Sequence, residues 1–193
     1  MSFARDPTVL IVEDERHLAK LYANWLGTQY RVRTAYGGEQ AIQSLDETVD
    51  VVLLDRRMPG LSGDEVLELI TEREYACKVA MVTAIEPDFD ILEMGFDDYL
   101  VKPVSLRELQ MTVERLLTRR TYDEQVDEYA RLLSKKVALE TEKSRRQLEA
   151  NQEFLELESR IEQLGSNVDE LVLGFDQEDV TAVFRDLPAG QGI

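Results

Sequence analysis

The sequence has little of the two residue types that most often build redox centres and metal clusters. It contains one cysteine, Cys77, and one histidine, His17, among 193 residues. A disulfide needs a second cysteine, and zinc-type sites gather several thiolate or imidazole ligands. These 193 residues therefore exclude an internal disulfide framework, a thiolate metal cluster and a site built on paired histidines.

Long apolar runs are also missing. No stretch approaches the roughly 20 apolar residues that a membrane-spanning helix needs, and the first residues show no apolar segment typical of a secretory signal peptide. We therefore expect a cytoplasmic protein that makes no contact with a membrane.

Positive charge is scarce, and lysine especially so. The chain holds 39 acidic and 22 basic residues, for a net charge of −17, and only six of the bases are lysines. Such a surface repels nucleic acid and anionic lipid. An acid excess with few lysines also suits a protein kept soluble in concentrated salt, where counterions screen self-repulsion. We expect a halophilic source, although an acidic mesophilic protein would have the same composition.

Short apolar runs divide the first half of the chain. Four of them are continuously apolar, which is typical of strands covered on both faces in a parallel sheet, and a fifth alternates as an edge strand does. The stretches between them have the spacing of helices. The pattern predicts an α/β fold with a doubly wound five-stranded parallel sheet. The expected strands are Thr8–Val12, Tyr30–Ala35, Val51–Leu54, Val79–Val82 and Tyr99–Val101.

The second half reads as helical. Ser105 and Glu108 have the spacing of a capping box, and no proline, glycine or strand signal follows until Gly165. We expect one long helix or a helical hairpin up to Leu164. Gly165 is expected to end it, with two short helical segments, Val168–Leu173 and Gln177–Leu187, beyond.

Charged and hydroxyl side chains stand where the predicted strands end. Glu13 and Asp14 follow the first strand, Asp55 follows the third, Thr83 the fourth, and Lys102 the fifth. The carboxyl ends of parallel strands meet at one edge of a sheet, where such folds bind ligands. Carboxylates with waters suit Mg²⁺, while an ammonium and a hydroxyl suit the oxygens of a phosphoryl group. The set predicts phosphoryl transfer to a carboxylate.

These residues resemble the receiver domain of two-component response regulators. The likeness covers roughly residues 7–120 and includes the run Leu53-Leu54-Asp55-Arg56-Arg57-Met58-Pro59-Gly60, with Gly63 beyond it. The resemblance implies a flavodoxin-like sheet with strand order 2-1-3-4-5. It also implies that a sensor histidine kinase is the partner and Mg²⁺ the cofactor. The protein would be a phosphoacceptor in signalling, with no other enzyme activity than its own phosphorylation and dephosphorylation.

The same resemblance assigns the site residues. It implies that Asp55 is phosphorylated and that Mg²⁺ is bound by carboxylates and one backbone carbonyl. It implies that a second set of residues binds the phosphoryl oxygens and switches the conformation of the domain. The implied metal ligands are Glu13, Asp14, Asp55 and the carbonyl of Arg57. The implied phosphoryl-binding and switch residues are Thr83, Ala84, Tyr99, Lys102 and Pro103.

Residues 121–193 form a second, strongly acidic part. They hold 17 acids and 8 bases, a net charge of −9 out of −17. Apolar residues recur at helix spacing in two groups, Val126 to Leu133 and Phe154 to Leu164. Together with the acidic receiver this layout resembles haloarchaeal receiver proteins that end in the HalX domain. We therefore expect a receiver over residues 1–120 and a helical, HalX-like module over residues 121–193.

Two roles for this helical module compete. As an interaction module it would form a homodimer or bind a partner protein, together with the switch face of the receiver. As a DNA-binding output it would make the protein a transcriptional regulator. The sequence lacks a net-basic recognition helix, and phosphate contacts weaken steeply with salt. The interaction module is favoured over DNA binding.

Overall fold

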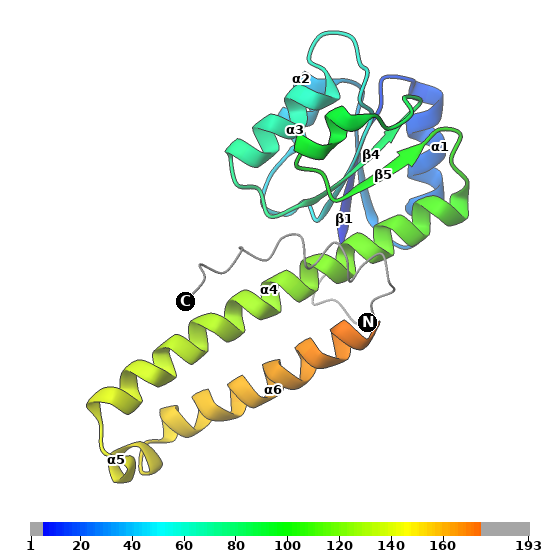
Figure 1. The fold of residues 1–193 in the computed structure, drawn as a ribbon. Helices are drawn as coiled ribbons and strands as arrows, with labels where there is room; N and C mark the ends of the chain where they lie inside the picture. Colours follow the sequence, from blue (N-terminus) through cyan, green and yellow to red (C-terminus); the bar gives the residue numbers. More distant parts are fainter. Residues whose placement is uncertain (1–5, 175–193) are drawn as a thin grey trace. The chain divides into compact units, whose positions relative to one another are not determined.

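The computed structural model describes residues 6–174, and the chain divides into two compact units between Arg120 and Thr121 (Figure 1). Within the described residues, no helix is both long enough and apolar enough to cross a membrane.

The N-terminal unit is built on a five-stranded, all-parallel sheet with the order β2-β1-β3-β4-β5. The doubly wound fold expected from the sequence is thereby confirmed. Its strands are β1 (Thr8–Val12), β2 (Arg31–Ala35), β3 (Val51–Leu54), β4 (Lys78–Thr83) and β5 (Asp98–Val101). Its helices are α1 (Arg16–Leu26), α2 (Gly38–Ser44), α3 (Gly63–Glu72), the short 3-10 helix η1 (Phe89–Glu93) and the first part of α4 (Leu106–Glu142).

Two apolar layers cover the two faces of this sheet. Along β1, Val9 and Ile11 belong to one layer, whereas Leu10 and Val12 belong to the other. Successive strand residues point to opposite faces, so a strand buried on both sides must be apolar throughout. One layer contains residues of α2 and α3 and the C-cap of α2: Ala41, Leu45, Val66, Leu67 and Ile70. The other contains residues of α1 and α4: Ala19, Tyr22, Leu26, Leu109, Val113, Leu116 and Leu117.

Side-chain caps set the starts of α3 and α4. At α3, Ser62 and Glu65 cap each other, since Ser62 Oγ accepts from the Glu65 N–H at 3.3 Å and Glu65 Oε2 accepts from the Ser62 N–H at 2.8 Å. Ser105 and Glu108 repeat this arrangement before α4, with the same two distances. Each cap satisfies backbone donors that the first helical turn leaves unpaired.

The C-terminal unit is a helical hairpin. The C-terminal part of α4 lies beside α6 (Gln152–Gly174), and the short α5 (Arg145–Glu149) occupies the turn (Figure 1). Ion pairs join the two long helices, from Glu128 to Arg160 at 3.1 Å and from Lys136 to Glu158 at 2.7 Å. Residue numbers rise along α4 as they fall along α6, so the two helices are antiparallel. The sequence had left open one long helix or a hairpin, and the structure is a hairpin.

The expected end of the helix at Gly165 is wrong. α6 continues through Gly165 to Gly174. Gly165 lies against Tyr129 of α4, and a Cβ there would be 3.5 Å from the Tyr129 ring. That distance is an ordinary van der Waals contact, so a side chain as small as that of alanine would also fit beside Tyr129. The expected segment Gln177–Leu187 lies outside the described residues.

Buried charge fastens α4 to the amino-terminal edge of the sheet. Arg120 pairs with Asp50 at 2.6 Å and donates to the Val49 carbonyl at 3.0 Å. Asp50, which is 8% exposed, also accepts from the Thr8 N–H at 2.7 Å. One turn earlier, Arg115 pairs with Asp98 at the start of β5. Arginines of α4 therefore neutralise a buried carboxylate just before β3 and a partly buried one at the start of β5.

The Arg120–Asp50 pair should contribute strongly to stability. Arg120→Ala leaves the Asp50 carboxylate buried without its cation, and we expect a loss of about 3 kcal/mol in the free energy of unfolding. The matched control is Arg31→Ala, because Arg31 pairs with Asp6 at 4.0 Å with both side chains more than 70% exposed. Its effect should stay below about 0.5 kcal/mol in urea unfolding. Equal losses would refute the assignment.

Candidate functional site

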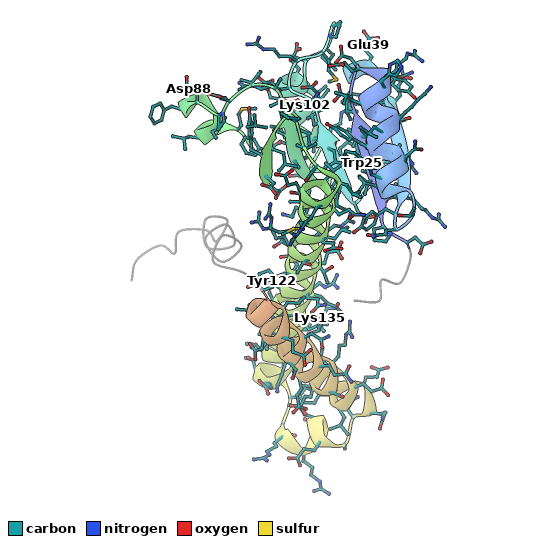
Figure 2. All side chains as sticks on the ribbon, turned by 90° about the vertical axis from the view of Figure 1, so that its right-hand side faces the viewer. Trp25, Glu39, Asp88, Lys102, Tyr122 and Lys135 are labelled. Atoms are coloured by element: carbon teal, nitrogen blue, oxygen red, sulfur yellow. The ribbon has the colours of Figure 1, made fainter. Side chains whose placement is uncertain are left out.

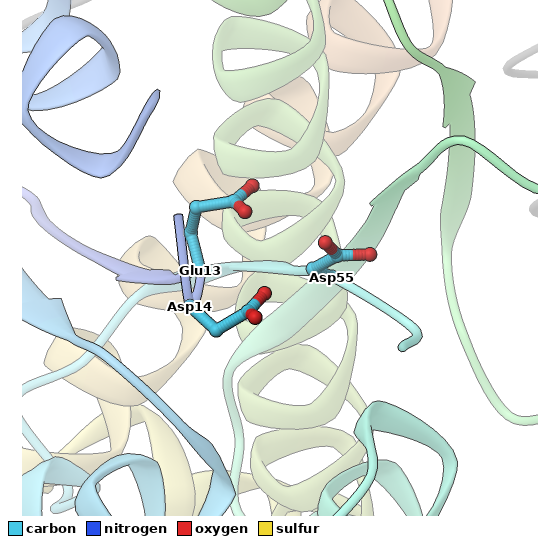
Figure 3. A group of neighbouring side chains, drawn as sticks. All are labelled: Glu13, Asp14 and Asp55. Atoms are coloured by element: carbon cyan, nitrogen blue, oxygen red, sulfur yellow. The ribbon is translucent and has the colours of Figure 1, made fainter. Parts of the chain in front are cut away.

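Three carboxylates meet at the carboxyl-terminal edge of the sheet. Glu13 and Asp14 directly follow β1, and Asp55 directly follows β3, the neighbour of β1. Each offers an oxygen within 4.8 Å of the others. Figure 3 shows the three side chains turned toward a common space. The parallel register of the two strands places these acids together, as the sequence predicted.

Lys102 joins two of these acids. It follows β5, and its Nζ lies 2.6 Å from Glu13 Oε2 and 2.6 Å from Asp55 Oδ2. Figure 2 marks Lys102 at this edge of the sheet. Its peptide bond to Pro103 is cis. One ammonium thus neutralises part of the charge of three carboxylates, which leaves a net charge of −2 when all are ionised.

Burial and hydrogen bonding act against each other in this cluster. Burial raises the pKa of Glu13, although the hydrogen bond from Lys102 opposes the rise. Burial alone would lower the pKa of Lys102, but its hydrogen bonds to Asp55 and Glu13 outweigh that effect and raise it. Lys102 therefore compensates only in part for the burial of the Glu13 carboxylate, whereas Lys102 itself stays charged.

The cluster suits a divalent cation. Its donors are all oxygens and its net charge is −2. Lys102 compensates only in part for the burial of the Glu13 carboxylate, so a second cation nearby would stabilise its ionised form. Asp14 makes no ion pair with a described residue, so its oxygens are free for a ligand, and its side chain also lines a cavity of about 770 Å³. Hard oxygen ligands beside open space are what Mg²⁺ requires. Among the described residues this is the only acidic group that lies close enough together to hold a metal.

The loop after β3 brings Arg57 to the same cavity. The Arg57 N–H donates to Asp55 Oδ1 at 3.3 Å, and the Arg57 side chain is exposed. Gly63 lies behind this loop, where a Cβ would come within 2.1 Å of the Asp55 carbonyl oxygen. Only glycine permits so close an approach, which explains the glycine that the sequence has at this position.

The remaining expected residues line the end of β4 and the start of β5. Thr83 is buried at the end of β4, and its Oγ1 accepts from the Ile85 N–H at 3.4 Å. Ala84, the next residue, is exposed. Tyr99 is half-buried in β5, and its hydroxyl donates to the Ile85 carbonyl at 2.9 Å. The sequence did not indicate this role of Ile85, because a backbone carbonyl leaves no signature in side-chain chemistry.

One further ion pair is not indicated by the sequence. Arg56 Nε lies 3.0 Å from Asp64 Oδ1 on α3, and only 13% of the Arg56 side chain is exposed. The two adjacent arginines therefore differ, because Arg56 is held by an acid while Arg57 faces solvent. Arg56 and Asp64 are eight residues apart in sequence, with a turn between them. No helical spacing could therefore have predicted this pair.

Comparisons with known proteins agree with this geometry. Residues 9–114 match the family described as response regulator receiver domain, and residues 118–184 match the HalX domain. A Haloferax volcanii protein named "Putative transcriptional regulator" is 51% identical over 160 residues, which cover 82% of this chain and 27% of that protein. The chain spans between 27% and 64% of the length of the curated relatives compared with it.

Solved structures show the same fold. The response regulator TrrA from Thermotoga maritima, in complex with Mg²⁺ and BeF, is 32% identical with a TM-score of 0.51, and the match covers 57% of this chain and 99% of that one. The BeF3-activated receiver domain of DrrB is 29% identical with a TM-score of 0.55, over 58% and 98% of the two chains.

The burial of Glu13 gives a pH-dependent expectation. Because its folded-state pKa is raised, the carboxylate form costs stability, and that cost grows as the pH rises through the folded-state pKa. Without Mg²⁺, Glu13→Gln should therefore be more stable than the wild type at pH 7. The difference should vanish below the ordinary glutamate pKa of about 4.3.

Denaturant unfolding at the two pH values measures this difference. The matched control is Glu86→Gln, which removes an exposed carboxylate that lines the cavity beside Asp14. Its effect should stay within about 0.5 kcal/mol. A less stable Glu13→Gln at pH 7 would mean that the contact with Lys102 outweighs burial, and the interpretation would be wrong.

Proposed function

The chain belongs to the response regulators that carry a receiver domain, and from this premise we propose that Asp55 accepts a phosphoryl group from a sensor histidine kinase. The observation that carries the proposal is the Lys102 ammonium, 2.6 Å from both Asp55 and Glu13, beside a third carboxylate. An Asp55 oxygen attacks phosphorus, and the bond from phosphorus to the donor's histidine nitrogen breaks with its electron pair. A carboxylate is already the nucleophile, so no base is needed.

Charge must be balanced before a phosphoryl group can approach this edge. We assign Glu13, Asp14, Asp55 and the Arg57 carbonyl as the residues that hold Mg²⁺. When bound, the ion supplies positive charge to the phosphoryl oxygens. The proposal is supported by the oxygen-only donor set and by the TrrA relative, whose structure is a complex with Mg²⁺ and BeF.

The residues at the ends of β4 and β5 have a second role in the proposal. Lys102 turns from the carboxylates to the phosphoryl oxygens, and Thr83 adds a hydroxyl donor. The Ala84 N–H and the turn at Pro103 complete the pocket. Tyr99 is the switch residue, since its hydroxyl must leave the Ile85 carbonyl if Thr83 and the loop after it move toward the phosphoryl group. A change of charge coupled to a two-position side chain is a sufficient switch.

The C-terminal part is proposed as the responding module. We assign residues 1–120 to the receiver and residues 121–193 to a HalX-type module that binds a second copy or a partner protein. Its hairpin buries a narrow apolar seam, with Phe154, Ile161, Leu164 and Leu171 each less than 10% exposed. The acidic composition and the haloarchaeal relative support a halophilic source.

DNA binding is the second candidate for this module. It is favoured by one observation, the name of the Haloferax volcanii relative as a transcriptional regulator. Against it stands the net charge of −9 of residues 121–193, counted as 8 bases minus 17 acids. Phosphate contacts also weaken as salt rises.

The assignment of Asp55 is tested by phosphorylation. With Mg²⁺ and a small phosphodonor, the wild type should gain one phosphoryl group by intact mass, whereas Asp55→Asn should gain none and keep its fold. Glu86→Gln should be phosphorylated like the wild type, and chelation of Mg²⁺ should abolish the reaction in both. A phosphorylated Asp55→Asn protein would place the acceptor elsewhere.

The role of the C-terminal module is tested by comparing association with DNA binding. Phosphorylation should change the dissociation constant of self-association or partner binding by roughly 5- to 150-fold, the usual range of coupling between sites. Sedimentation of the wild type and of Asp55→Asn, each with phosphodonor, measures this change. A gel-shift titration at the working salt concentration should show only weak binding without sequence preference. Sequence-specific complexes there would replace the interaction module by the DNA-binding candidate.

A further inference from the structure

The part of α4 in the C-terminal unit keeps a row of apolar residues that α6 leaves uncovered. Within the described hairpin, the four buried apolar side chains all belong to α6, and no side chain of α4 between Thr121 and Glu142 is buried. The uncovered residues recur at steps of four, three and four, the spacing of one helix seam. Val126 and Leu133 are half-buried, Ala130 is exposed, and Val137 is 60% exposed. We call these four residues the open seam.

The open seam lies to one side of the contact with α6. Tyr129 lies against Gly165, and Lys136 pairs with Glu158 at 2.7 Å, so these two residues of α4 face α6. Ala130 and Val137 each follow one of them by a single position, which is about 100° around a helix. The open seam is therefore a helix face that the hairpin itself does not cover.

Charge along this stretch of α4 is divided into two halves of opposite sign. Residues 121–129 hold four acids and no base, whereas residues 130–138 hold three bases and no acid. At steps of three or four residues, one row of the helix carries the exposed side chains of Glu124, Asp127, Arg131 and Lys135, the last of which is marked in Figure 2. We call these four residues the charged row.

The charged row flanks the open seam on the side away from α6. Asp127 directly follows Val126, and Arg131 directly follows Ala130. Asp127, Arg131 and Lys135 form no ion pair with any described residue. An apolar face with an acidic half and a basic half beside it is thus available to a partner.

The order of the charges selects the occupant of this face. A ligand of uniform charge, such as the phosphates of DNA, would be repelled by one half of the charged row. A second copy of α4 in parallel orientation would place like charges at the same level. A second copy in antiparallel orientation places acid opposite base in both halves. The chain's own α4, reversed in direction, is therefore the complementary surface.

We propose that two copies of this chain dimerise through α4, with their open seams packed against each other in antiparallel orientation. A two-fold axis beside Tyr129 brings Asp127 of each copy to the level of Arg131 of the other. The same axis brings Glu124 to the level of Lys135. Every contact then occurs twice, which closes the dimer. The proposal rests on the interaction role given above to residues 121–193 and deepens it, and it requires no phosphorylation of Asp55.

Charge reversal in one half of the charged row tests the contact in the full-length protein. The basic variant is Glu124→Lys with Asp127→Arg, and the acidic variant is Arg131→Asp with Lys135→Glu. Sedimentation equilibrium at low salt, without phosphodonor, should give a wild-type dimer. Each variant alone should show an at least roughly tenfold higher dissociation constant, because all the opposed charges become alike.

Reversal of both halves distinguishes the antiparallel contact from a parallel one. The exchanged variant carries all four substitutions, so the order of its charges is inverted while its net charge is unchanged. It should dimerise with wild-type affinity, because base again lies opposite acid. Sedimentation of labelled wild type with this variant should show no mixed dimer, since acid then meets acid and base meets base. A parallel contact would give mixed dimers instead.

A matched control separates the charged row from charge in general. Glu68→Lys with Glu72→Lys makes the same change of charge as the basic variant, on exposed acids of α3 that form no ion pair with a described residue. This control should not weaken the dimer, because a smaller net negative charge reduces the general repulsion between copies.

The apolar contact is tested where charges are screened. In 2 M salt, Val137→Ser should still weaken the dimer, because the open seam loses apolar contact. Val172→Ser, which changes a valine of α6 that is 41% exposed, should leave the dimer unchanged. Both variants keep every charge, so they test the proposal even if a charge variant fails to fold.

Four results would overturn the proposal. They are a monomeric wild type, mixed dimers of the exchanged variant with the wild type, a weaker dimer in the α3 control, and a Val137→Ser dimer as tight as the wild type. A monomeric wild type whose DNA binding is lost in the acidic variant would assign the basic half to phosphates instead. Phosphorylation of each variant is measured in parallel by intact mass, so that failure at Asp55 is distinguished from failure of the α4 contact.

Discussion

The chemistry of the N-terminal unit depends on one constraint, the parallel register of β1, β3, β4 and β5. Because all four strands run the same way, the residue that follows each of them reaches the same edge of the sheet. Glu13, Asp55 and Lys102 belong to segments separated by about forty residues, yet one ammonium contacts both acids. Their convergence requires no specific loop structure beyond the strands themselves.

The opposite edge of the sheet has the complementary problem and a different solution. There Asp50 is buried and Asp97 and Asp98 are partly buried at the strand starts, and cations of α4 and β4 neutralise them. Each of these three acids has its own cationic partner. At the carboxyl-terminal edge, one lysine lies beside three carboxylates, so negative charge is in excess. The two edges of the sheet therefore differ in the number of cations beside their acids. At the amino-terminal edge the charges are balanced and stabilise the fold, whereas at the carboxyl-terminal edge the excess negative charge suits a cationic ligand.

Much of this arrangement could be predicted from residues alone. The apolar runs indicated all five strands, and the order of acids, hydroxyl and lysine along the chain indicated the site, because periodicity and strand-end chemistry are both local signals. What escaped prediction depends on contacts between distant segments. The Tyr99 hydroxyl binds a carbonyl, and Arg56 binds Asp64 across a turn. Gly165 looked like a helix end because glycine is usually costly inside a helix, but α6 continues through it, with Leu164 and Leu171 buried on either side of the glycine. The turn of the hairpin had neither proline nor glycine, and Ser144 and Asn151 mark it only through their caps.

The close approach of Gly63 to Asp55 has a mechanical consequence. On that side, helix α3 supports the main chain of Asp55 directly, and the Asp55 N–H is bonded to the Val12 carbonyl at 2.9 Å. The backbone behind the carboxylate therefore has no room to yield. On the other side lie the open cavity and the Ile85 loop, held to Tyr99 by a single side-chain hydrogen bond. The site is stiff in one direction and compliant in the other, so any added bulk on Asp55 has to be absorbed by the β4–β5 side of the unit.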